Sequence, residues 1–129
     1  MILSLRTDKP EAEIGLFTES GEQVAYHKWQ AHRELSSTIL AKIEEILSSN
    51  TLSQKDITGI VFYKGPGSFT GLRIGASVAN AFAYSLGMPS IGETDDDWIK
   101  NGTQKLKNGQ SEMLIPEYGA PPHITEQKK

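Results

Sequence analysis

The stretch ITGIVFYKGPGSFTGLRIGASVANAFAYSLG, residues 57–87, decides the fold of this chain. It opens with a compact apolar run over residues 57–63, which predicts a strand that is covered on both faces. A turn rich in glycine and proline follows, and Ser68 is a suitable N-cap for a helix. We predict that helix over Phe69–Leu86, because Gly87 and the proline two residues later form the usual stop signal.

The residues before this stretch predict a meander of short strands and one more helix. Strands are expected over residues 1–6, 13–18 and 23–29, joined by tight turns and therefore antiparallel. An amphipathic helix is expected over residues 34–49. Its apolar residues at helical spacing are Leu35, Ile39, Leu40, Ile43, Ile46 and Leu47. A last short strand is expected over residues 90–92.

The predicted order of elements is β-β-β-α-β-α-β. Two right-handed crossovers that progress in one direction place both helices on the same face of the sheet. The strand order becomes 3-2-1-4-5 in a mixed five-stranded sheet. This is the arrangement of an α/β half-domain of the ribonuclease H-like and actin-like ATPase folds.

Composition excludes several classes of protein. A length of 129 residues suits one modest core. The 16 Asp and Glu residues outnumber 13 Lys and Arg residues, so the chain lacks the basic surplus of a freestanding nucleic-acid binder. Without cysteine it has no disulfide or thiolate metal site. No apolar run is long enough to span a bilayer and no signal peptide is evident, so we expect a cytoplasmic protein.

The predicted helix Phe69–Leu86 carries a single charge, Arg73, in its eighteen residues. A helix that is apolar or small nearly all round belongs to a core. A chain this short has little else to bury it, so we expect the two helices to present a seam to another subunit. The alternative is that this helix packs only against the first helix and the C-terminal residues.

The glycine loop at residues 64–71 invites comparison with a phosphate-binding loop. A nucleotide loop of that class needs a lysine and a hydroxyl residue directly after its last glycine. Here Gly71 is followed by Leu72 and Arg73, so the spacing fails the test. The remaining readings are a rigid turn that sets the helix angle, or a minimal nucleotide-binding module.

As a string, GPGSFTGLRIG at residues 65–75 closely resembles the signature of the bacterial TsaB (YeaZ) family. The resemblance runs from residue 1 to about residue 93. Residues 116–129 again look like the usual end of a family member. We therefore expect an actin-like domain at residues 1–93. Residues 94–129 would be a linker and C-terminal segment in place of the family's second domain, a short form.

The resemblance implies a non-catalytic scaffold or dimerisation subunit in the synthesis of threonylcarbamoyladenosine (t6A) on tRNA. TsaB-like proteins pair through the two-helix face with a TsaD-like transferase, a TsaE-like ATPase joins that pair, and tRNA is contacted only indirectly. A homodimer through the same face, or one that has lost its original role, is the alternative. The expected partner-interface residues are Leu35, Ile39, Ser68, Phe69, Thr70, Gly71, Arg73, Ile74, Ser77, Val78 and Ala81.

No catalytic, cofactor or metal site is expected. The resemblance places Arg6 where the family has an aspartate at the end of the first strand, and a guanidinium cannot ligate a metal. The partner enzymes use two histidines four residues apart on the first helix, but here His32 is followed by Ser36. The acidic run at residues 95–97 is explained more simply as a solvated helix start than as a cation site.

With both helices on one face, the other face of the sheet needs a cover. We expect apolar residues from the C-terminal segment to fold back over it, the alternative being a disordered tail. These residues are Trp98, Ile99, Met113, Leu114, Ile115 and Tyr118. The Asn-Gly pairs at residues 101–102 and 108–109 are expected in turns.

Overall fold

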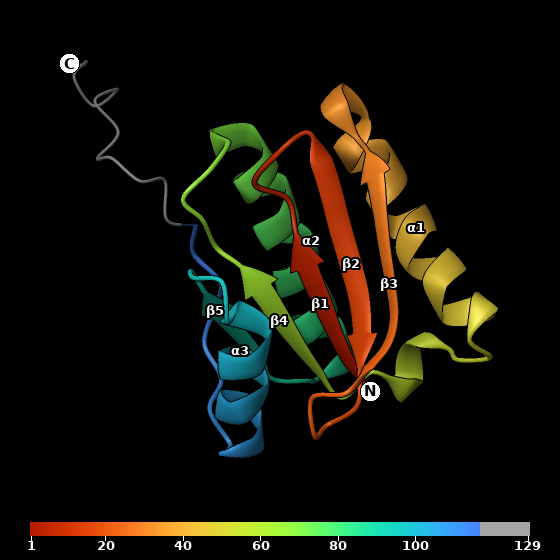
Figure 1. The fold of residues 1–129 in the computed structure, drawn as a ribbon, viewed down its shortest axis with the longest axis vertical. Coiled ribbons are helices and arrows are strands. Elements are labelled where there is room, and N and C mark those ends of the chain that lie inside the picture. Colours follow the sequence, from red (N-terminus) through yellow and green to blue (C-terminus); the bar gives the residue numbers. More distant parts are fainter. Residues whose placement is uncertain (117–129) are drawn as a thin grey trace.

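The computed structural model describes residues 1–116, which form a five-stranded sheet with helices on both faces (Figure 1). A short 3-10 helix, His32–Glu34, comes directly before α1, and a second one, Gln54–Asp56, lies between α1 and β4. The strands and helices are β1 (Ile2–Arg6), β2 (Glu11–Phe17), β3 (Gln23–Gln30), α1 (Leu35–Ser49), β4 (Gly59–Tyr63), α2 (Phe69–Leu86), β5 (Ser90–Glu93) and α3 (Trp98–Lys107).

The sheet has the order β3-β2-β1-β4-β5, which confirms the predicted topology. β1 and β3 each pair antiparallel with β2, as tight turns require. β4 pairs parallel with β1 and with β5, each after a helical crossover. The predicted bounds of α2 match the structure, and Gly87 ends the helix in the left-handed conformation with φ +66°.

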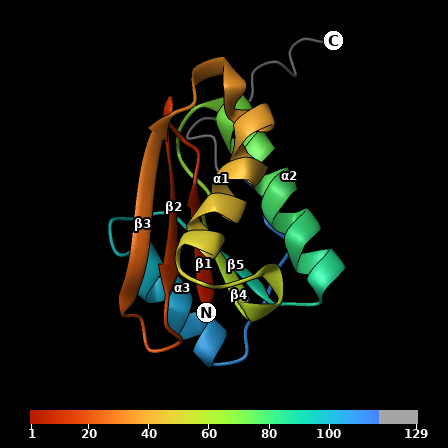
Figure 2. The same ribbon diagram turned by 90° about the vertical axis from the view of Figure 1, so that its right-hand side faces the viewer.

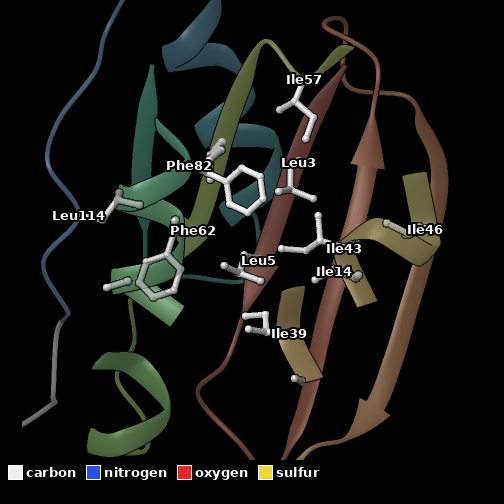
Figure 3. Close-up of a cluster of buried hydrophobic side chains, with 14 of the residues drawn as sticks. Leu3, Leu5, Ile14, Ile39, Ile43, Ile46, Ile57, Phe62, Phe82 and Leu114 are labelled. Carbon is white, nitrogen blue, oxygen red and sulfur yellow. The ribbon is translucent and has the colours of Figure 1, made fainter. Parts of the chain in front are cut away.

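The helices divide between the two faces of the sheet. α1 and α2 lie on one face, as predicted, and α3 lies on the other (Figure 2). Alternate residues of the central strands serve the two layers: Leu5 and Phe62 point to α1 and α2, whereas Val61 and Tyr63 belong to the cluster under α3. The larger layer holds the main core, in which Ile39 and Ile43 of α1 are fully buried (Figure 3).

The prediction of a turn at residues 101–102 was wrong. Both residues lie inside α3, where Gly102 packs directly on β4: a Cβ added to it would lie 2.4 Å from Val61 Cγ1. Trp98 begins this helix and is buried, with its ring centroid 5.7 Å from that of Tyr63. Glycine is needed here because the helix lies so close to the sheet.

The other residues expected to cover this face have different positions. Ile99 is partly buried against the same cluster, but Met113 and Ile115 are 76% and 68% exposed. Leu114 is buried on the opposite side of the sheet, in the main core. The segment runs along the edge of the sheet rather than across its face, so only one side chain in three turns inward. Tyr118 lies outside the described residues.

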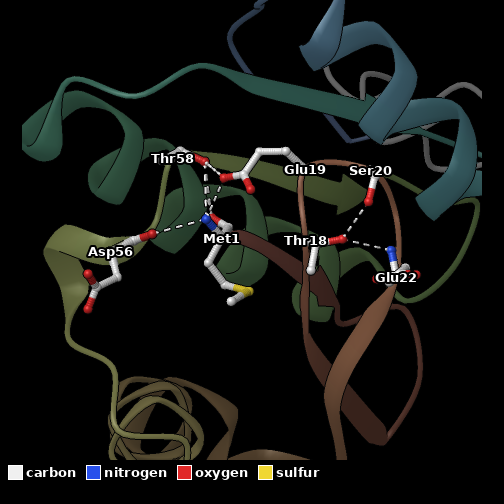
Figure 4. A network of polar contacts seen from close by, with 7 residues as sticks. All are labelled: Met1, Thr18, Glu19, Ser20, Glu22, Asp56 and Thr58. Atoms are coloured by element: carbon white, nitrogen blue, oxygen red, sulfur yellow. Dashed lines mark hydrogen bonds and ion pairs between the residues drawn. The ribbon is translucent and has the colours of Figure 1, made fainter.

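A polar network ties the N-terminus to two distant loops (Figure 4). The ammonium group of Met1 lies 2.6 Å from Glu19 Oε2 and donates to the carbonyl oxygen of Asp56 at 3.1 Å. The hydroxyl of Thr58 donates to the same Glu19 oxygen at 2.7 Å. The hydrogen bond from the ammonium group, helped by Thr58, lowers the pKa of Glu19 from 4.5 to about 2.

Candidate partner-binding site

A groove runs between α1 and α2 on the two-helix face. Its middle part, a cavity of ≈450 Å³, is lined by Ser36 from α1 and by Thr70, Arg73, Ile74, Ser77 and Val78 from α2. Thr70 and Ile74 continue into a cavity at the start of both helices, beside His32. Ser77 and Val78 continue into a cavity at the other end, beside Leu40 and Ala81. The three cavities therefore form one continuous surface.

The walls of this groove are apolar or small, with few charges. Leu40 projects from α1 with 54% of its surface exposed. Val78 of α2 shares a cavity with Leu40, Ile74 lies one turn earlier on α2, and both are partly exposed. Arg73 lies at the outer rim, its guanidinium carbon 5.2 Å from the ring centroid of Phe69. A patch of this kind beside polar neighbours is typical of a protein-binding surface.

Most of the predicted interface residues reach this surface, but Ile39 does not. Ser68, Phe69, Thr70, Arg73, Ser77 and Ala81 are exposed, while Ile74 and Val78 are partly exposed. Ile39 is 0% exposed and lines none of the three cavities, so its place among the interface residues was wrong. Leu35 is 5% exposed and lines the cavity beside His32, so its contact with a partner stays a prediction. Their positions on α1 turn them toward the sheet. Leu40, expected among the buried residues, takes the outward position instead, and an apolar residue directly after Ile39 was the available signal.

The glycines of the loop and of α2 serve the inside of the protein. A Cβ added to Gly67 would lie 2.4 Å from Asp8 Cβ, and one added to Gly71 would lie 2.2 Å from the carbonyl oxygen of Thr7. A Cβ on Gly75 would lie 2.1 Å from Thr7 Oγ1. These three glycines, four residues apart, form a strip without side chains on the inner side of the loop and helix, which we call the glycine strip.

The glycine strip lets α2 lie directly against the end of β1. The backbone N–H of Ser68 donates to the carbonyl oxygen of Asp8 at 2.9 Å, which fixes the start of the helix to this turn. The Ser68 hydroxyl accepts from the N–H of Gly71 at 3.2 Å and caps the helix as predicted. An added side chain at Gly71 would thus point to Thr7 of the same chain, but the residue is partly exposed and lines the cavity beside His32, so its contact with a partner stays a prediction.

The end of β1 is closed by a stacked ion pair. Arg6 Nε and one terminal nitrogen donate to the two carboxylate oxygens of Asp8, at 2.8 and 3.2 Å. The guanidinium carbon lies 3.9 Å from the ring centroid of Tyr63 on β4. Burial alone would lower the pKa of Arg6, but its hydrogen bond to Asp8 and the nearby negative charges raise that pKa above its usual value.

More side chains surround this pair on β2 and β3. Arg6 pairs across the sheet with Glu13, a carboxylate that is only 7% exposed. The hydroxyl of Tyr26 donates to Glu13 at 2.5 Å. Burial, followed by this hydrogen bond, raises the pKa of Tyr26 well above its usual value. The charges at this end of the sheet are therefore paired within the chain.

These residues do not fit a metal ion. The end of β1, where the resemblance expects an aspartate, holds the cationic side chain of Arg6, whose donors are turned to Asp8 and which cannot ligate a metal. Within residues 1–116, no three His, Cys, Asp or Glu side chains group closely enough to hold a metal ion. Asp95 lies in the turn just before α3, where its carboxylate accepts from the N–H of Asp97 at 3.1 Å.

None of the helices formed by residues 1–116 is long and apolar enough to cross a membrane.

Comparison with solved structures places the fold. The chain superposes on YeaZ from Pseudomonas aeruginosa with a TM-score of 0.67 and 26% identity, over 73% of this chain and 43% of that one. Thermus thermophilus RuvC, solved with a Holliday junction substrate, superposes with a TM-score of 0.54 over 97% of this chain at 10% identity. That second likeness concerns the fold alone and confirms the ribonuclease H-like class.

Sequence comparison identifies the family. Residues 25–99, more than half of the chain, match the family model described as TsaD, tRNA N6-adenosine threonylcarbamoyltransferase. The tRNA threonylcarbamoyladenosine biosynthesis protein TsaB of Escherichia coli is 31% identical over 111 residues, which cover 81% of this chain and 47% of that protein. The chain spans less than half the length of the TsaB proteins it matches. On these grounds the chain belongs to the TsaB (YeaZ) family, within the sequence group that the transferase model describes.

Proposed function

We propose that this chain acts in tRNA threonylcarbamoyladenosine biosynthesis as a non-catalytic subunit that binds a TsaD-like transferase. The observation that carries the proposal is the groove between α1 and α2, with Leu40, Ile74 and Val78 in its walls. The partner would cover these apolar side chains, a TsaE-like ATPase would join the pair, and tRNA would be reached through the partner. The whole surface lies within residues 1–93.

The closed end of β1 supports a binding role over a catalytic one. Arg6 lies where a metal-binding carboxylate would be needed, and it is held by Asp8 and Tyr63. The glycine loop offers little to a nucleotide, because Gly67 and Gly71 lie against Asp8 and Thr7 of the same chain. Both features favour a scaffold over the minimal nucleotide-binding module.

The test is the affinity of the full chain for the TsaD-like transferase of the same organism. Ile74→Glu and Val78→Glu each place a charge against the apolar wall of the groove. A central interface residue contributes about 2 kcal/mol or more, so each variant should bind at least about 30-fold more weakly by calorimetry.

Val24→Glu is the matched control, because Val24 is also an exposed apolar residue, 42% exposed, but lies on β3 away from the groove. It should bind as the wild type does, and circular dichroism should give all three variants the wild-type spectrum. If Ile74→Glu and Val78→Glu keep wild-type affinity, the groove is not the binding surface. If wild-type protein forms only a homodimer and ignores the transferase, the scaffold role itself is wrong.

A further inference from the structure

The outer edge of β5 is covered by a short segment of the chain. β4 occupies one edge of β5, and residues 111–114, which we call the strap, occupy the other. The N–H of Ser90 donates to the Ser111 hydroxyl at 3.1 Å, and the N–H of Glu112 donates to the carbonyl oxygen of Ser90 at 2.8 Å. The N–H of Gly92 donates to the Glu112 carboxylate at 3.0 Å. Side chains of the strap thus satisfy two of these three edge groups.

The strap is also held from α2 by one side chain. The carboxamide of Asn80 donates to the carbonyl oxygen of Leu114 at 3.1 Å and accepts from the N–H of Leu114 at 2.9 Å. A side-chain amide that pairs with both backbone groups of one residue imitates a neighbouring strand. The side chain of Leu114 is 3% exposed and points into the cluster that contains Phe62 and Phe82 (Figure 3).

These contacts define what the site recognises. The strap binds in extended form through a serine hydroxyl, a carboxylate one residue later and a leucine two residues after that. The residues on either side of Leu114 are largely exposed and take no part. Only residues 108–110 connect the strap to α3. Main-chain bonds to a sheet edge with one buried side-chain anchor are a recurring mode of peptide recognition.

We propose that the β5 edge and Asn80 form a binding site for an extended peptide of the pattern Ser-Glu-X-Leu. The strap of the same chain fills the site here, and the strap of a second copy can replace it. The second copy is the occupant that the structure favours, because an identical strap makes the same contacts in the same site. This site is separate from the α1–α2 groove and does not depend on the transferase.

The strap of the same chain limits the affinity with which a separate peptide can bind the site. A segment tethered by a short linker has an effective concentration of about 1 mM at its site. A free peptide of the same sequence must compete with it, so its apparent Kd for the wild-type chain cannot fall much below about 1 mM. Releasing the strap should expose the intrinsic affinity of the site.

The first experiment uses the full chain and a fluorescent peptide of residues 108–116. Leu114→Asp in the protein removes the buried anchor and should release the strap. Fluorescence anisotropy should then give peptide binding at least tenfold tighter than to the wild-type chain. The same peptide carrying Leu114→Asp should not bind. The double variant Asn80→Ala, Leu114→Asp should bind the wild-type peptide at least fivefold more weakly than the single variant. A folded Leu114→Asp chain with no gain in peptide affinity overturns the proposal.

A second measurement covers the case in which Leu114→Asp disturbs folding. In Asn80→Ala, amide exchange at Ser90, Gly92 and Leu114 should accelerate by one common factor, because the strap opens as a unit. Ser77→Ala, on the exposed side of the same helix, is the control and should leave these rates unchanged. If Leu114 alone accelerates while Ser90 and Gly92 keep wild-type protection, the strap is not a separable ligand.

The role of a second copy needs its own test. A Leu114→Asp chain has an open site, whereas an Asn80→Ala chain has an intact strap that is held less firmly. Mixed above the Kd measured for the peptide, the two should form a 1:1 complex by light scattering that neither forms alone. If they stay monomeric, the exchange between copies is wrong even where the peptide binds.

Discussion

Gly71→Ala tests whether the close approach of α2 to β1 holds the fold together. The added Cβ would lie 2.2 Å from the carbonyl oxygen of Thr7, a backbone atom that no rotamer change can move. Forcing an extra carbon into packed structure costs about 1–3 kcal/mol, and a backbone clash belongs at the upper end. Alanine also favours the helical conformation over glycine by up to about 1 kcal/mol, which offsets part of this cost. The net loss of stability should be about 2 kcal/mol.

Urea denaturation followed by the fluorescence of the two tryptophans measures this loss. A change of about 2 kcal/mol in a chain of this size lowers the melting temperature by about 8 °C. The m-value should stay unchanged, since the unfolded state is not altered. Ser77→Ala, exposed on the same helix, should change stability by less than about 0.5 kcal/mol. If Gly71→Ala is as stable as the wild type, close packing on Thr7 is not what the glycine strip provides.

Two more predictions concern charges. Arg6→Ala should destabilise the protein by about 3 kcal/mol in thermal unfolding, because the Asp8 side chain is 6% exposed and would lose its partner; stability equal to the wild type would contradict the ion pair. The Met1–Glu19 pair should stabilise the protein above pH 4.5 and lose its effect as the pH falls toward 2, because the pKa of Glu19 is lowered to about 2. Melting curves of the wild type and Glu19→Gln should therefore converge over that range, and a constant difference between them would refute this.

The sheet could be predicted because its signals are local and agree with one another. Tight turns join the first three strands, and the stop signal at Gly87 ends the second crossover helix. Handedness then leaves a single strand order. The outward residues of α2, such as Ile74 and Val78, followed from helical periodicity in the same way.

The remainder depends on contacts between residues far apart in the sequence. Gly102 reads as a turn residue until Val61 is seen beneath it. Helical periodicity predicted that Leu35 and Ile39 lie on α1. Which side of α1 meets the sheet is set by packing, and periodicity alone does not show it. The pairing of Asn80 with Leu114 spans 34 residues and has no local pattern. The partner of Arg6 lies only two residues away, yet its stacking on Tyr63 comes from strand register.

The glycine strip also has a mechanical consequence. Gly71 of α2 lies directly against the carbonyl oxygen of Thr7, so at this point the helix backbone, about 5 Å across, separates the turn after β1 from whatever rests on Thr70 and Ile74. Soft side chains usually absorb small displacements, and at Gly71 the helix meets the backbone carbonyl oxygen of Thr7 instead. A protein that displaced the outer surface of α2 would therefore displace the end of β1 by nearly the same distance.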